Sequence, residues 1–114
     1  MLMPASPNAV SSDADRSDSI HFVEPFPFVD APSAAWDRMT DAVCRLSRTT
    51  IITQSDTLLV AECRSRIFRF VDDLELRLEV EKQQIAVRSA SRFGYSDFGV
   101  NRRRVERLRR LFDP

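Results

Sequence analysis

A strictly alternating run near the middle of the chain constrains its fold more than any other feature. From Leu74 to Glu81, apolar and charged residues alternate, so four apolar side chains share one face of an extended strand and four charged side chains share the other. A strand of this kind belongs to a sheet that is covered on one side and solvated on the other, as antiparallel sheets commonly are. We therefore expect the core to lie on one face of a sheet.

Shorter patterns with a period of two predict the remaining strands. After a turn at Lys82-Gln83, residues 85–91 return as a strand. Pro25 and Pro27 remove two N–H donors from residues 20–28, which are expected to form an edge strand or an extended segment. The other expected strands are 49–54 and 57–63, joined as a hairpin around Ser55-Asp56, and 67–71.

Two segments have the period of an amphipathic helix. Residues 34–47 place their apolar side chains on one face and their charged side chains opposite, behind Ser33 as the expected N-cap. Residues 101–112 predict a second helix, with Asn101 as a plausible N-cap. The order of elements predicts an α+β domain in which an antiparallel sheet of four to five strands carries two helices on one face.

The first 19 residues are rich in Ser, Asp, Ala and Pro, and we expect a mobile N-terminal arm over 1–19 and one domain over 20–114. The N-terminal residues lack the basic segment and the long apolar segment of a signal peptide. No apolar run approaches the length of about 20 residues that spans a bilayer, so a cytoplasmic protein is expected. The only histidine is His21, and Cys44 and Cys63 form no CxxC motif, so we expect two free thiols, no metal site and no cofactor.

Arginine gathers in the last predicted helix, where residues 101–112 hold six arginines and one glutamate. The whole chain has 17 Lys+Arg and 17 Asp+Glu, so its net charge attracts neither nucleic acid nor an anionic surface. The helical period places Arg104 inside the apolar arc, whereas Arg103, Arg107 and Arg110 face water. A buried guanidinium needs a carboxylate partner, and the candidates are Asp72, Asp73 and Asp97.

The first turn of this helix carries Arg102, Arg103 and Arg104, although cations there oppose the helix dipole. A bound anion would offset that cost, as at other helix N-termini. Alternatively, carboxylates of the protein supply the anion, because structural ion-pair networks imitate functional sites. If a ligand is bound, the expected binding residues are Arg88, Ser89, Ser91, Arg92, Tyr95, Ser96, Asn101 and Arg104, with Asp72, Asp73 and Asp97 orienting the arginines.

Asp72 and Asp73 follow one another in a strand pattern, so their side chains are expected on opposite faces of the sheet. Without a bulge, at most one of them can reach a given site. We expect a bulge or turn in which one of the two pairs with Arg88 or Arg92.

Several runs in this chain are similar to a known family. The runs are Phe70-Val-Asp-Asp-Leu-Glu75, Val87-Arg-Ser-Ala-Ser-Arg92, Gly94-Tyr-Ser-Asp97 and Gly99-Val-Asn-Arg-Arg-Arg-Val-Glu106, together with Ser6-Pro-Asn-Ala-Val-Ser-Ser12 and His21-Phe-Val-Glu-Pro25. Over about residues 6–112 the chain resembles the domain of unknown function 1499 family. That resemblance implies a bacterial or plastid relationship, with membrane anchors or plastid targeting segments in some relatives, and no established activity. Ala9 stands where the family has a cysteine, so thiol chemistry or lipid attachment at that position cannot operate here.

These features favour a non-enzymatic binding domain. The expected partner is a small anionic or amphipathic ligand, or a protein, held near the loop 88–104. One alternative is an enzyme in which Asp73 or Asp97 is the general base and arginines stabilise negative charge. A second is weak, salt-dependent nucleic-acid binding through the arginines of the last helix, although no basic strand interleaved with aromatic residues supports it. No G-x-S-x-G motif is present, so hydrolase chemistry is not expected.

Overall fold

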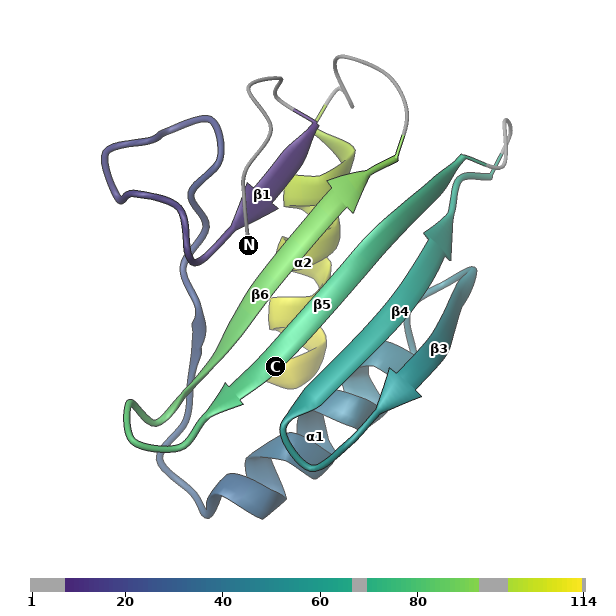
Figure 1. Ribbon diagram of the computed structural model, residues 1–114. Coiled ribbons are helices and arrows are strands. Elements are labelled where there is room, and N and C mark those ends of the chain that lie inside the picture. The colour runs from purple at the N-terminus through teal and green to yellow at the C-terminus, as the bar shows by residue number, and fades with distance from the viewer. Residues whose placement is uncertain (1–7, 67–69, 93–98, 114) are drawn as a thin grey trace.

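The architecture is a single antiparallel sheet with two helices on one side (Figure 1). The computed structural model describes residues 8–66, 70–92 and 99–113. The elements in chain order are β1 (Ala9–Ser11), β2 (Phe26–Pro27), α1 (Pro32–Cys44), β3 (Thr49–Gln54), β4 (Leu58–Arg64), β5 (Val71–Glu79), β6 (Gln84–Ser91) and α2 (Val100–Phe112).

The strand order is β1-β6-β5-β4-β3, with β2 also paired to β6, and every pairing between these strands is antiparallel. The register aligns Leu59 of β4 with Leu76 of β5, and Leu76 with Val87 of β6. All three side chains are buried, so one row of apolar residues crosses the centre of the sheet. The predicted α+β class is confirmed.

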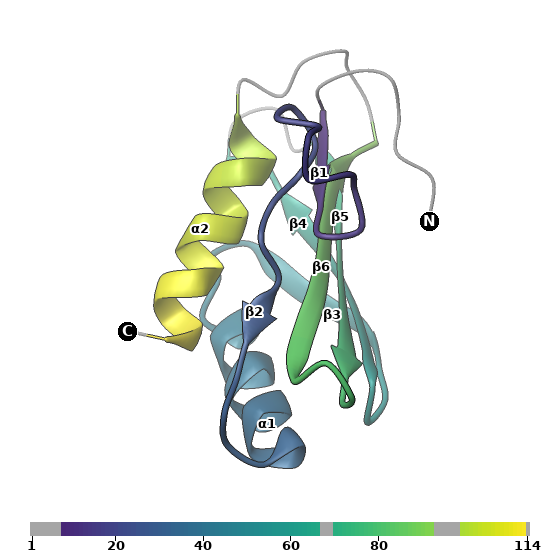
Figure 2. The ribbon, with the colours of Figure 1, turned by 90° about the vertical axis from the view of Figure 1, so that its left-hand side faces the viewer.

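Both helices pack against the same face of the sheet, and neither helix covers the other face (Figure 2). We call the uncovered side the open face. Between the sheet and the helices, Phe26 and Phe112 meet edge to face with ring centroids 5.8 Å apart. Met39 of α1 and Leu108 of α2 are fully buried beside them. Removal of this apolar surface from water is the main driving force for the fold.

The alternation that predicted the central strand is confirmed where β5 lies under the helices. Leu74 and Leu76 are 0% exposed, whereas Val80 is 50% exposed. Val80 has left the ladder because the turn to β6 begins there, and that turn places Gln83 at a φ of 51°. The expected strand 67–71 lies mostly outside the described residues, and its last residue, Val71, begins β5.

The sheet has six strands because two short segments before α1 both pair with β6. One is β2, in the segment expected at an edge. The other is β1, which lies within the expected arm and places Val10 in the core at 3% exposure. The backbone continues the pairing on either side, since the Ser91 amide donates to the carbonyl oxygen of Asn8 at 2.9 Å. A three-residue strand is too short to show a period, which is why the sequence did not reveal it.

Both helices begin before the residues expected to cap them. In α1, Pro32 occupies the first turn and Ala31 is the N-cap, because proline suits a position whose N–H has no partner within the helix. In α2 the N-cap is Gly99, with a φ of 81° that glycine adopts without strain. Asn101 therefore lies inside the helix and is not its N-cap. Among the described residues, neither helix is long and apolar enough to cross a membrane.

Candidate functional site

Asn101 is the centre of a buried polar network that joins α2 to the sheet. Its Oδ1 accepts hydrogen bonds from Ser89 Oγ at 2.7 Å and from Arg104 Nη1 at 2.8 Å. Its Nδ2 donates to Ser91 Oγ at 2.9 Å and to the carbonyl oxygen of Asn8 at 3.1 Å. Asn101 is 0% exposed, so these bonds satisfy an amide that would be costly to bury alone. One side chain thereby ties together β6, α2 and the residue that precedes β1.

Arg104 extends this network to the adjacent strand β5. Its Nη2 donates to Asp72 Oδ2 at 2.8 Å, and its Nη1 also donates to Ser89 Oγ at 3.0 Å. The side chains of Arg104 and Asp72 are 11% and 8% exposed. The prediction that Arg104 points into the protein and finds a carboxylate is confirmed, with Asp72 as the partner. For this arginine, the anion is supplied by the protein itself.

Asp73 lies on the open face and pairs with Arg92, as the alternation of side chains along a strand requires. Arg92 Nε and Nη2 donate to the two oxygens of Asp73 at 2.9 and 2.7 Å, and Nη2 also reaches Glu62 Oε2 at 2.8 Å. The hydrogen bonds to Asp73 and then to Glu62 raise the pKa of Arg92. Asp72 and Asp73 pair with consecutive residues of β6, so the expected bulge is absent at this position.

The expected site is divided between the two faces of the sheet. Arg88 lies on the open face opposite Glu75, and its Nε is buried without a hydrogen-bond partner among the described residues. Asp73, the candidate general base, lies on the same face and accepts a hydrogen bond from Arg92. The residues on the helix side are Ser89, Ser91, Asn101, Arg104 and Asp72. Those on the open face are Arg88, Arg92 and Asp73. Tyr95, Ser96 and Asp97 lie outside the described residues.

A pocket of about 240 Å³ lies where the first turns of α2 approach the start of β3 and the end of β4. We call it the arginine pocket, because six of its ten lining residues are arginines and, among the described residues, none is acidic. It combines α2 with the open end of the β3–β4 hairpin, which is distant from α2 in the sequence. The lining residues are Ser47, Arg48, Cys63, Arg64, Ser65, Arg66, Val100, Arg103, Arg104 and Arg107.

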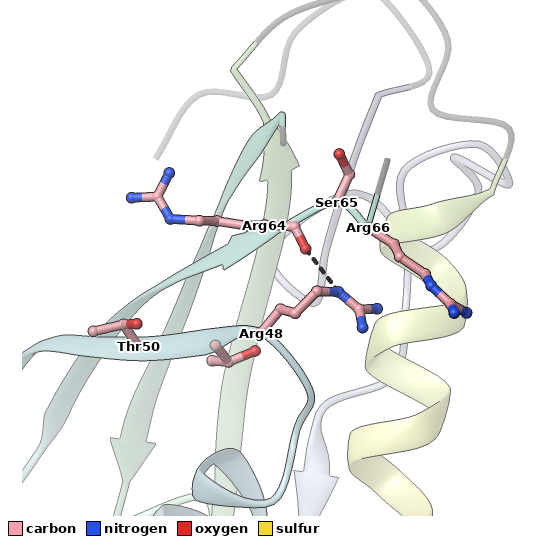
Figure 3. A pocket seen from close by; sticks show the side chains of 6 residues that line it. Arg48, Thr50, Arg64, Ser65 and Arg66 are labelled. Atoms are coloured by element: carbon pink, nitrogen blue, oxygen red, sulfur yellow. Dashed lines mark hydrogen bonds between the residues drawn. The ribbon is translucent and has the colours of Figure 1, made fainter. Parts of the chain in front are cut away.

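The arginines of this pocket differ in how their charge is compensated. Arg104 is paired with Asp72, and Arg64 lies 3.3 Å from Glu62. In the described part of the chain, no carboxylate lies within ion-pair distance of Arg48, Arg66 or Arg107. Figure 3 shows Arg48 and Arg66 pointing toward α2, while Arg64 points away from it. The uncompensated charges therefore converge on the pocket.

Arg48 is held in an unusual backbone conformation at the edge of this pocket. Its φ of 54° lies in the left-handed region, which costs free energy for a residue with a side chain. Two hydrogen bonds fix it there, since the Arg64 amide donates to the Arg48 carbonyl oxygen at 2.9 Å and Arg48 Nε donates to the Arg64 carbonyl oxygen at 3.3 Å (Figure 3). Glycine would adopt this conformation more easily, so the arginine side chain is present despite the backbone cost.

Cys63 lies on the wall of the arginine pocket and is 2% exposed. Burial raises the pKa of its thiol, and the Thr49 hydroxyl donates to Sγ at 3.4 Å. Cys44 is exposed, and both cysteines are free. Among residues 8–66, 70–92 and 99–113, no group of three His, Cys, Asp or Glu side chains could hold a metal ion.

Sequence reasoning did not find Arg48 and Arg66, because neither belongs to a periodic or motif-like run. The available signal was that arginines flank both ends of the predicted hairpin, at the start of one strand and the end of the next. The pairing of Thr49 with Cys63 brings those ends together. The hairpin register, rather than any local motif, assembles this side of the pocket.

Comparison with known proteins identifies a family but no characterised relative. Neither the curated proteins nor the solved structures show a significant match to this chain. The sequence profile of the family described as "Protein of unknown function (DUF1499)" matches residues 1–112, which include both the buried network and the arginine pocket. The resemblance inferred from the sequence runs is thereby confirmed, and the chain belongs to the DUF1499 family.

Proposed function

We propose that this protein is a binding domain for a small anionic ligand, which it holds in the arginine pocket. The observation that carries the proposal is the convergence of Arg48, Arg66 and Arg107 on one concave site without a carboxylate partner among the described residues. Like charges gathered in a partly enclosed site repel one another. A bound anion would reverse the sign of this contribution.

The type of cation indicates the type of ligand. A guanidinium presents a planar fork of N–H donors that matches two oxygens of a carboxylate or a phosphate. Several such forks around a pocket of about 240 Å³ suit a compact group with many acceptor oxygens. Phosphate and carboxylate groups both meet this requirement.

The buried network has a positioning role in this proposal. Arg104 lines the arginine pocket and is fixed by Asp72, Ser89 and Asn101, so the helix that carries Arg107 is anchored to the sheet. Of the residues expected to bind a ligand, the proposal therefore keeps Arg104 beside the ligand and assigns Ser89, Ser91 and Asn101 to holding α2 in place. Arg88 and Arg92 lie on the open face and do not line this pocket.

The test is a calorimetric titration of the protein with inorganic phosphate and with citrate at low ionic strength. Arg48→Gln, Arg66→Gln and Arg107→Gln should each weaken binding by about tenfold, the change that corresponds to about 1.4 kcal/mol for the loss of one charged contact. Arg110→Gln is the matched control, because Arg110 is exposed on the same helix and does not line the pocket.

The control separates a specific site from a general effect of positive charge. Binding that is weakened by the three pocket variants and not by Arg110→Gln would support the proposal. Equal weakening in all four variants would show that the anion is attracted by net charge alone, and the pocket would then not be a site. Failure of both phosphate and citrate to bind the wild-type protein would refute anion binding.

A further inference from the structure

A second hollow of about 350 Å³ adjoins the arginine pocket at the same end of the β3–β4 hairpin (Figure 3). Four residues line both spaces, so the hollow and the pocket share a wall. These residues are Arg48, Arg64, Ser65 and Arg66. Thr49 and Thr50 of β3 complete the hollow. Thr50, the cross-strand partner of Glu62, gives it a hydroxyl group on the open face, whereas Thr49 lies on the helix side beside Cys63.

Two hydroxyl groups in the hollow are free to donate to a ligand. The Thr50 hydroxyl has no hydrogen-bond partner among the described residues, and Thr50 is exposed. Ser65 Oγ accepts the Phe70 amide at 2.8 Å, and this contact leaves the proton of the Ser65 hydroxyl available. Thr49 is different, because its hydroxyl has one proton and already has two acceptors within reach, the Ser47 carbonyl oxygen at 3.1 Å and Cys63 Sγ at 3.4 Å.

Guanidinium groups extend to both sides of the shared wall. Arg48 and Arg66 point toward α2, and Arg64 points to the opposite side of the hairpin (Figure 3). A single small anion in the arginine pocket would contact only the first side. The second side, with Arg64 and the hydroxyls of Thr50 and Ser65, has donors for another oxyanion, which would share Arg64 with the Glu62 carboxylate 3.3 Å away.

We infer that the ligand carries an oligophosphate chain, with one phosphate in the arginine pocket and a neighbouring phosphate in the adjoining hollow. This inference rests on the proposed function and specifies its ligand. Each phosphate offers several oxygens to guanidinium and hydroxyl donors together, which a carboxylate with two oxygens does less completely. Two linked phosphates also bind with an effective concentration that two separate ions lack.

The test compares inorganic phosphate with tripolyphosphate by calorimetry at one fixed ionic strength. Tripolyphosphate should bind at least about tenfold more tightly than phosphate, because the second group binds intramolecularly once the first is held. A parallel titration with ATP distinguishes the source of the chain. Binding of ATP as tight as that of tripolyphosphate indicates a nucleotide, and binding of tripolyphosphate alone indicates an inorganic chain; either result supports the inference.

One variant addresses the hollow without altering the arginine pocket. Thr50→Val removes a hydroxyl from the hollow and preserves the shape of an exposed strand residue. It should weaken tripolyphosphate binding by about three- to tenfold, in keeping with the loss of one hydrogen bond, and leave phosphate binding unchanged. Thr53→Val is the matched control, because Thr53 lies exposed on the same strand and lines neither space.

The outcomes separate this inference from the proposed function. If phosphate binds and tripolyphosphate binds no more tightly, the oligophosphate inference is wrong and the proposed anion site stands. If tripolyphosphate binds more tightly but Thr50→Val and Thr53→Val behave alike, charge alone accounts for the gain and the second subsite is refuted. If no anion binds, both proposals fail.

Discussion

Replacement of Arg104 by alanine should destabilise this protein more than replacement of any other arginine of α2. The side chain of Arg104 is 11% exposed, and it is paired with Asp72, whose side chain is 8% exposed. The substitution removes the guanidinium and leaves the carboxylate of Asp72 buried without its charge partner. Breaking a buried ion pair from one side costs about 3–5 kcal/mol, most of which is the penalty of the stranded charge.

The rest of the network adds less to this cost. Ser89 Oγ and Asn101 Oδ1 both lose the hydrogen bond from Arg104, but they keep the bond of 2.7 Å that joins them. The Asp72 carboxylate therefore dominates the expected loss. A domain of this size has a free energy of unfolding of about 5–15 kcal/mol, so the variant would lose a large part of its stability.

The measurement is urea unfolding of the wild-type protein, Arg104→Ala and the control Arg110→Ala. With a slope of about 2 kcal/mol per molar urea, a loss of about 4 kcal/mol lowers the midpoint by about 2 M. Arg110 is exposed and forms no ion pair among the described residues, so Arg110→Ala should change stability by no more than about 0.5 kcal/mol.

The converse substitution, Asp72→Ala, should cost less than Arg104→Ala. Arg104 lines the arginine pocket, so its guanidinium can take up water when the carboxylate is lost, whereas Asp72 does not line that pocket. The double variant should be more stable than the sum of the two single losses implies. A loss in Arg104→Ala that matches that of Arg110→Ala would refute the reasoning, because it would show that the pair is not desolvated.

Two further predictions concern titratable groups away from this pair. Burial raises the pKa of the Cys63 thiol, while Cys44 is exposed, so iodoacetamide should alkylate Cys44 first in the folded protein; equal rates by mass spectrometry would contradict this. The hydrogen bond from His21 lowers the pKa of Asp18 below its ordinary value of 3.8. Ionised Asp18 therefore stabilises the fold at pH values above 3.8, and this contribution is lost as the pH falls through the lowered pKa. Asp18→Asn should therefore be less stable than wild type at neutral pH and approach it well below pH 3.8, and a gap in urea midpoint that does not narrow would count against the Asp18 contribution.

Patterns with a local physical origin predicted the fold well. The alternation through Leu74 and Leu76 depends only on which face of a strand is buried, and the inward position of Arg104 depends only on the helical period. The segments that were missed have no such period. The strand Ala9–Ser11 is defined by its pairing with β6, and the start of α2 is set by Gly99. Each of these depends on a partner or a backbone angle that spacing along the chain does not reveal.

The partners of the individual arginines could likewise not be predicted from the sequence, because tertiary contacts decide which charges are compensated. Arg102 donates to the carbonyl oxygens of Ser19, Ile20 and Phe22, and Arg109 to those of Glu24 and Pro25, so both fix the segment before α1 against the helix.

Together with Arg104, these arginines add polar contacts to the apolar residues and Asn101 that hold α2 against the domain. In the described part of the chain, no ion pair or hydrogen bond that joins α2 to the domain involves Arg107, nor Arg48 and Arg66 across the pocket. Arg48 is held at a positive φ, which costs free energy for a residue with a side chain, and it points toward α2 (Figure 3), whose Arg104 and Arg107 line the same pocket. The cost of that arrangement in the absence of a ligand is the strongest argument that an anion belongs there.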